Sequence, residues 1–183
     1  MSSTKIKISV RDMVFTALFA AILCAVAPIA FPIGPVPITL ATLIICTTAG
    51  ALDWKFCALP VVLYVLLGAV GAPVFSNFEG GFHKIAGVTG GFIIGYIPLA
   101  LSVGLAVKVF RRKAWSYPVG MVIGTVLLYT CGTAWFMMQT RLSLLESLAL
   151  CVTPFLLGDT IKIVLATVAA PQLRKAIEHF NRN

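Results

Sequence analysis

The stretch GVTGGFIIGYIPLALSVGLAVK, residues 87–108, carries no charged side chain before its last residue, Lys108. A helix needs about 20 predominantly apolar residues to cross the hydrocarbon core of a bilayer. This stretch therefore predicts a membrane-spanning helix. Five further apolar runs indicate the same kind of structure, at residues 12–31, 38–52, 56–73, 117–138 and 148–172.

The composition of the whole chain agrees with a membrane protein. Of its 183 residues, 60% are hydrophobic and 11% are charged, whereas a soluble domain is about 45–50% apolar and about 25% charged. No polar stretch is long enough for a separate soluble domain. We therefore expect residues 1–183 to form a single domain, an all-α integral membrane bundle of six transmembrane helices. The first run resembles a signal peptide, but it leads into further apolar runs, which favours a transmembrane helix.

The formal net charge of +8 is explained by where the basic residues lie. With a cytoplasmic N-terminus, Lys84 and Arg141 fall outside and Lys162 lies within the membrane. The other basic residues fall on the cytoplasmic side: Lys5, Lys7, Arg11, Lys55, Lys108, Arg111, Arg112, Lys113, Arg174, Lys175 and Arg182. This bias predicts that both termini are cytoplasmic. The lipid bilayer, through its anionic leaflet, is the partner that the charge implies, and nucleic acid is not.

Neither a metal site nor an enzyme is indicated by the motifs. The five cysteines lie scattered without a C-x-x-C pair, and His83 and His179 are isolated, so we expect no metal and no cofactor. The chain has no H-E-x-x-H and no G-x-S-x-G motif, so we expect no catalytic residues. It also lacks a G-x-x-x-x-G-K-[ST] loop and cannot hydrolyse ATP itself.

Small residues recur at four-residue spacing, which lets membrane helices approach closely. The glycines of this kind predict internal helix packing: Gly87, Gly91 and Gly95, then Gly120 and Gly124. The first run carries a similar row, Ala17, Ala21 and Ala25. The sequence leaves open whether this alanine row packs internally or docks another membrane protein.

Asp159 and Lys162 interrupt the apolar run PFLLGDTIKIVLA, residues 154–166. Counted from a helix start near residue 148, Asp159 would lie ~16 Å along the helix. A charged residue at the centre of a membrane helix costs roughly 2.5–3.5 kcal/mol, so the two should face the bundle interior or a wet cavity. A buried ion pair that fastens the helix is one interpretation. We favour a ligand site, because Gly158 leaves room for an approaching molecule.

The carboxylate offers acceptors and the ammonium offers donors, which together suit an amide or a urea. Candidate ligand residues from elsewhere are Asn77, Lys84 and the anion-binding helix start around Thr89, Gly90 and Gly91, with walls from Phe75, Tyr96 and Trp135. The loop over residues 71–91 carries Phe75, Phe78 and Phe82, which predicts an apolar cap. The threonines of the second run, among them Thr39 and Thr42, are expected to bond back to helix carbonyls.

Four motifs occur in the order found in one family: GPVPITL (34–40), GAPVFSNFEGG (71–81), GVTGGF (87–92) and PFLLGDTIK (154–162). With them the chain resembles the BioY proteins, the biotin-binding membrane (S) components of energy-coupling factor (ECF) transporters. The resemblance covers nearly the whole chain. It implies biotin as the transported ligand, a multi-pass protein of a bacterial cell membrane, and an ECF T subunit with ATPase subunits as partners.

The resemblance also assigns roles to residues. It implies that Asp159, Lys162 and Asn77 contact the fused ring head of biotin, and that Thr89, Gly90 and Gly91 line the same pocket. It further implies that Ala17, Ala21 and Ala25 dock on the T subunit. The chain departs from the family in having Ala41 where glutamine is common and Val88 where proline is common, which puts fine affinity in doubt.

Two function classes stay open on the residues alone. The first is a biotin-binding component that works with ECF partners or as a solitary transporter. The alternative is a proton- or ion-coupled secondary transporter of another small amphiphilic molecule, with Asp159 titrating against Lys162.

Overall fold

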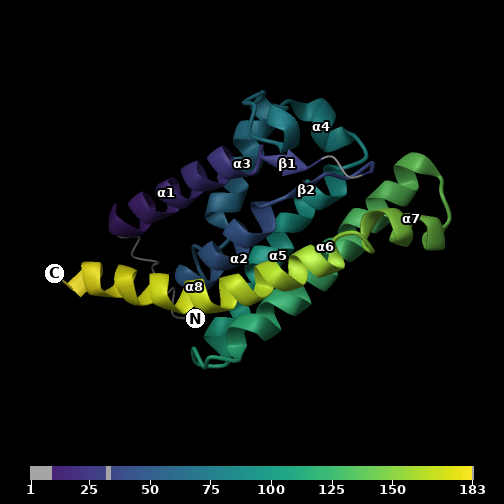
Figure 1. Ribbon diagram of the computed structural model, residues 1–183. Helices are drawn as coiled ribbons and strands as arrows, with labels where there is room; N and C mark the ends of the chain where they lie inside the picture. The colour runs from purple at the N-terminus through teal and green to yellow at the C-terminus, as the bar shows by residue number, and fades with distance from the viewer. Residues whose placement is uncertain (1–9, 32–33, 183) are drawn as a thin grey trace, which may run out of the picture.

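Eight α-helices make up most of the part of the chain that the computed structural model describes, residues 10–31 and 34–182 (Figure 1). The basic residues Lys5 and Lys7 lie outside the described residues. The helices are α1 (Val10–Val26), α2 (Ala41–Ala51), α3 (Leu59–Val70), α4 (Phe82–Ala86), α5 (Gly90–Val109), α6 (Ser116–Thr140), α7 (Leu144–Cys151) and α8 (Leu156–Arg182).

Three of these helices are long and apolar enough to cross a membrane by themselves: α5, α6 and the Leu156–Phe180 part of α8. The helices α2 and α3 are apolar but shorter. Each of the six predicted runs overlaps at least one of these helices, and the chain is mostly helical, as expected. The brevity of α2 follows from the prolines before it, since Pro35 and Pro37 deny it an earlier start.

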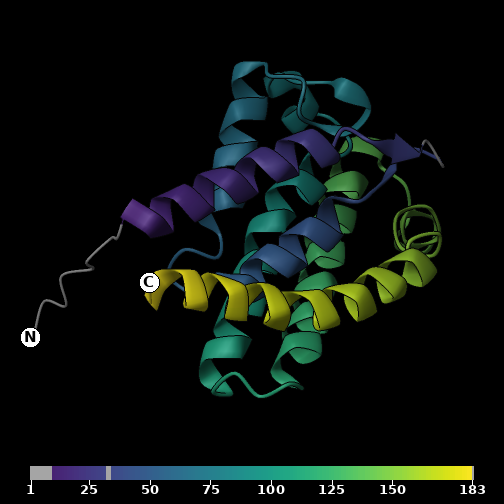
Figure 2. The ribbon, with the colours of Figure 1, turned by 60° about the vertical axis from the view of Figure 1, so that its left-hand side comes forward.

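The central pair is formed by α5 and α6, which run antiparallel side by side (Figure 2). A Cβ added to Gly124 would lie 2.7 Å from Leu99 Cδ1, and one added to Gly95 would lie 2.9 Å from Leu128 Cδ1. The added Cβ of Gly124 would also lie 2.9 Å from the backbone oxygen of Leu99, so a larger residue there would push the two helices apart. The predicted role of these glycines in helix packing is confirmed, although Gly87 lies before the start of α5.

A short antiparallel hairpin, which the sequence analysis did not predict, precedes α2. Its strands are β1 (Ala30–Phe31) and β2 (Ile38–Thr39), paired as Ala30 with Thr39 and Phe31 with Ile38. The backbone N–H of Ala41 donates to Thr39 Oγ1, at 3.3 Å, where α2 begins. The hairpin thus leads directly into the helix.

The loop between α3 and α5 is more ordered than expected, because it contains a 3-10 turn (Ser76–Phe78) and α4. Phe75 is buried, with its ring edge-on to Tyr64 at a centroid distance of 5.4 Å. Phe78 and Phe82 are 66% and 71% exposed. The predicted cap of three phenylalanines is therefore wrong for two of them.

The predicted helix over residues 148–172 is interrupted. The chain leaves α7 after Cys151 and enters α8 at Leu156, with Pro154 in the turn between them. At the other end of α7, Ser143 and Glu146 form a capping box, and the hydrogen bond from the Ser143 hydroxyl lowers the pKa of Glu146. Asp159 consequently lies in the first turn of α8, about 4.5 Å from its start, and the expected ~16 Å was wrong.

The alanine row lies on the outer face of α1. Ala17, Ala21 and Ala25 are exposed, whereas Phe19 and Leu23 on the opposite face are buried. The residues that pack α1 onto the rest of the protein are thus different ones. Internal packing, one of the two interpretations left open, is excluded for this row.

Candidate functional site

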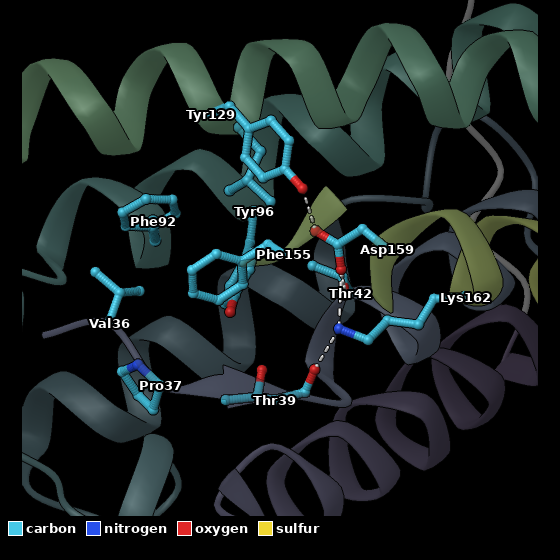
Figure 3. A pocket seen from close by; sticks show the side chains of 11 residues that line it. Val36, Pro37, Thr39, Thr42, Phe92, Tyr96, Tyr129, Phe155, Asp159 and Lys162 are labelled. Atoms are coloured by element: carbon cyan, nitrogen blue, oxygen red, sulfur yellow. Dashed lines mark hydrogen bonds and ion pairs between the residues drawn. The ribbon is translucent and has the colours of Figure 1, made fainter. Parts of the chain in front are cut away.

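Asp159 and Lys162 form an ion pair inside the protein, on the first two turns of α8 (Figure 3). Lys162 Nζ lies 2.9 Å from Asp159 Oδ1, and the two residues are 9% and 5% exposed. The hydroxyl of Tyr129, on α6, donates to Asp159 Oδ2 at 2.7 Å. The hydroxyl of Thr42, on α2, donates to Asp159 Oδ1 at 3.3 Å. Three helices therefore converge on one carboxylate.

The ammonium of Lys162 also reaches the hairpin, where it donates to the carbonyl oxygen of Thr39 at 2.8 Å. An ammonium has three donors, and a carboxylate has about four acceptor sites. Among the described residues, Lys162 uses two donors and Asp159 accepts three hydrogen bonds. One donor on Lys162 Nζ and one acceptor position on Asp159 Oδ2 thus remain, the combination that suits a urea or an amide.

This pair lies at one end of a cavity of about 40 Å³. That is far below the volume of about 300–1,000 Å³ typical of small-molecule pockets, so the site must widen to admit a ligand larger than a few water molecules. Aromatic rings, short apolar side chains and two threonines make up the rest of its lining (Figure 3). The lining residues are Val36, Pro37, Thr39, Thr42, Phe92, Tyr96, Leu128, Tyr129, Phe155, Asp159 and Lys162.

A second cavity of about 30 Å³ adjoins the first and shares five lining residues with it, among them Phe92 and Tyr96. Phe75 and Thr89 line the second cavity but not the first. The shared residues lie between the two cavities and border both of them. Of the predicted walls, Tyr96 therefore borders both cavities and Phe75 borders one.

A third cavity of about 240 Å³ continues this row, since it shares Pro37 and Thr89 with the second. Asn77 and Lys84 line it. The resemblance implied that Asn77 contacts the same ring as the ion pair. The structure does not place Asn77 beside that pair. It places that side chain with Lys84, whose ammonium is 2.8 Å from the carboxylate of Glu79.

Trp135, Gly90 and Gly91 do not line these three cavities. The indole Nε1 of Trp135 donates to the carbonyl oxygen of Gly87 at 2.9 Å. A Cβ added to Gly91 would collide with the Cβ of Trp135. These three predicted ligand residues instead pack α6 against the start of α5.

The structure also shows where the two residues lie at which this chain departs from the family pattern. Ala41 is buried as the first residue of α2 and lines none of the three cavities. Val88 lines the third cavity. Of these two residues, only Val88 borders the row of three cavities.

Sequence reasoning missed two polar members of the site. Tyr129 carried a signal, since a tyrosine inside a membrane helix needs a partner for its hydroxyl. Thr42 was expected to bond back to its own helix, and that expectation was wrong. Both donate to Asp159, a contact that depends on how the three helices are arranged.

The fold and the cavities define a helical membrane protein with a charged, partly enclosed site for a small molecule. A family model described as "BioY family" matches residues 1–179. The chain belongs to this family.

Individual relatives are similar over almost their whole length. A protein named "Biotin transporter BioY" from Thermotoga maritima is 35% identical, over 90% of this chain and 96% of the relative. "Biotin transporter BioY2" from Lactococcus lactis is 31% identical, over 100% of this chain and 98% of the relative.

One solved structure is similar as well. It is described as the crystal structure of the S-component for biotin from an ECF-type ABC transporter. It matches with a TM-score of 0.85 and 26% identity, and covers 96% of this chain and 95% of its own.

Proposed function

We propose that this protein binds biotin within the membrane and mediates its uptake, as a transporter component and not an enzyme. The observation that carries the proposal is the buried pair of Asp159 and Lys162 with one acceptor and one donor unused. Membership in the BioY family and the names of the relatives support the same substrate. They do not favour the alternative of a proton- or ion-coupled transporter of another molecule.

The chemistry of the two partners is complementary. The ureido ring of biotin has two N–H donors and a carbonyl acceptor. Asp159 accepts from one ring N–H, and Lys162 donates to the ring carbonyl. Tyr129 holds the carboxylate in place through its hydrogen bond of 2.7 Å. The ring head therefore enters at the first cavity, which widens from its volume of about 40 Å³ as biotin binds.

The remaining length of biotin is an apolar chain that ends in a carboxylate. The chain lies along Tyr96 and Phe75, and the carboxylate ends near Thr89, in the direction of the third cavity. Asn77 reaches the ring, as the family resemblance implies, if the loop over residues 71–81 closes over the occupied site. Lys84 contributes to the tail end after parting from Glu79.

We further propose a multi-pass arrangement of six membrane spans in a bacterial cell membrane, with both termini in the cytoplasm. The clustering of Arg111, Arg112 and Lys113 between α5 and α6 supports this orientation. The exposed alanine row of α1, Ala17, Ala21 and Ala25, supports docking to an ECF T subunit, which associates with ATPase subunits. The sequence has no ATP-binding loop of its own.

Binding calorimetry with the purified protein in detergent tests the substrate. We expect biotin and desthiobiotin to bind, because both carry the ureido ring. Hexanoic acid, which has a comparable tail and no ring, should not bind. Failure of biotin to bind to folded protein would overturn the proposal. Uptake that collapses with the proton gradient while ATP is maintained would favour the secondary transporter.

A further inference from the structure

A separate cavity of about 270 Å³ lies at the other end of α5, away from the row described above. We call it the basic cavity. The α2–α3 turn, the end of α5, the α5–α6 loop and α8 all contribute to it. Its lining residues are Asp53, Trp54, Gly104, Lys108, Arg111, Arg112 and Arg174. It shares no lining residue with the other three cavities.

Positive charge exceeds negative charge around this cavity. Four cations line it, and two carboxylates pair with them, which leaves a net charge of +2. Glu178 lies 2.6 Å from Arg112 Nη1 and 3.5 Å from Arg174 Nε. Asp53 lies 3.9 Å from Arg174 Nη2. The protein itself therefore balances only half of the charge.

Two of the cations are held in fixed positions. Arg174 is buried, and its Nη1 donates to the carbonyl oxygen of Gly50 at 3.2 Å. The ammonium of Lys108 lies over the ring of Trp54, 3.5 Å from its centroid. A cation over an aromatic face is attracted without losing its charge. Lys108 can thus still attract an anion in the cavity.

Among the four cations, Arg111 is the one whose side-chain charge is least balanced by other groups of the protein. No hydrogen bond or ion pair of its side chain occurs within residues 10–31 and 34–182. Its backbone has φ of 52°. The N–H of Arg111 donates to Lys108 O, and the N–H of Arg112 donates to Val107 O at 2.8 Å. These bonds form the Schellman motif that ends α5, with arginine at the position where glycine is usual.

An arginine at this position is conformationally unfavourable, since a side chain in the left-handed region is strained and glycine is not. Helix termination alone would therefore favour glycine. Arg112, the next residue, also has a positive φ of 61°. The guanidinium of Arg111 thus stands at the basic cavity despite a backbone cost, which points to a role for its charge.

We propose that the basic cavity binds a phosphate group. Guanidinium groups form paired hydrogen bonds with phosphate oxygens, and an ammonium contributes a point charge. The cavity lies where the apolar span of α5 ends, and in the proposed membrane arrangement this end meets the lipid headgroups. A phospholipid headgroup and a soluble phosphate both offer this chemistry, and basic pockets at the ends of membrane helices are suited to anionic headgroups.

The test compares thermal melting of the detergent-purified protein with four additives: phosphatidylglycerol, phosphatidylcholine, glycerol 3-phosphate and inorganic phosphate. At ten times the dissociation constant, one bound ligand raises the melting temperature by about 3–6 °C for a chain of this size. We expect this rise with phosphatidylglycerol and not with phosphatidylcholine. A rise with the soluble phosphates alone would keep the site and identify a soluble ligand.

The decisive variant is Arg111→Gly, which removes the guanidinium and also relieves the backbone. Arg141→Gly is its matched control, because Arg141 also has a positive φ, 57°, at the end of α6. Arg111→Gln keeps the side-chain length and removes only the charge. Both Arg111 variants should lose at least half of the shift, and the control should keep it. Equal shifts in all variants, or no shift in the wild type with any anion, would overturn the proposal.

Discussion

Replacing Asp159 with asparagine removes one negative charge from the proposed ring site and almost nothing of its shape. The carboxylate accepts hydrogen bonds from Lys162, Tyr129 and Thr42 and keeps one acceptor for the ligand. A hydrogen bond to a charged group contributes about 1.5–3 kcal/mol. Its loss should raise the dissociation constant for biotin roughly 10- to 150-fold, since 1.4 kcal/mol is about a factor of ten.

The same substitution leaves the ammonium of Lys162 without its counter-charge in a site that is 9% exposed. Removing one partner of a buried pair costs about 3–5 kcal/mol of folding free energy. The bond from Lys162 to Thr39 O remains, so we expect the lower end of this range. The melting temperature without ligand should then fall by roughly 6–12 °C.

Calorimetry of Asp159→Asn, well below its melting temperature, separates the two effects, because only folded protein contributes to the fitted stoichiometry. Asp53→Asn makes the same chemical change at the basic cavity and should bind biotin like the wild type. An unchanged biotin affinity in folded Asp159→Asn would refute the assigned role of the carboxylate. A fall in stoichiometry with unchanged affinity would show that the pair serves folding alone.

Three further outcomes are expected. Tyr129→Phe should weaken biotin binding roughly 3- to 10-fold in calorimetry, because the pocket carboxylate loses one of the bonds that orient it; equal affinity would contradict this positioning role. Ala21→Leu should leave melting and biotin binding unchanged yet block uptake in vesicles that hold the partner subunits, and normal uptake would argue against docking there. Gly124→Ala should lower the melting temperature, because its Cβ would lie 2.9 Å from the backbone oxygen of Leu99. Gly158→Ala, whose Cβ meets nothing within 4 Å, should leave it equal or higher.

The apolar runs predicted α5 and α6 to within three residues at each end. The bounds and the packing of these two helices could be predicted because hydropathy and glycine spacing are properties of the sequence itself. Helix breaks were less predictable. Pro98 and Pro171 lie inside α5 and α8, whereas Pro154 lies in the break between α7 and α8. A proline weakens a helix locally, and packing around each one decides whether the helix continues.

The charged residues of the candidate site could be predicted from the sequence, but the side chains that contact them could not. Asp159 and Lys162 are conspicuous because charge is expensive in an apolar run. Tyr129 and Thr42 come from helices 30 and 117 residues away in sequence, and only the arrangement of those helices brings them together. Trp135 was misplaced for the same reason, since its ring packs at the start of α5 instead of lining the row of cavities.

The spacing of the ion pair also bears on how α8 enters the membrane during synthesis. Asp159 and Lys162 are three residues apart on one helix, so they can pair as soon as that turn forms, before any other helix arrives. The two charges then enter the bilayer together as a neutral unit. Both residues lie in the first two turns of the apolar span of α8 and not at its centre, which lowers the cost of insertion further, because that cost is greatest at a helix centre. The insertion machinery can thus accept α8 as an independent segment, and the polar site is completed only when α2 and α6 assemble around it.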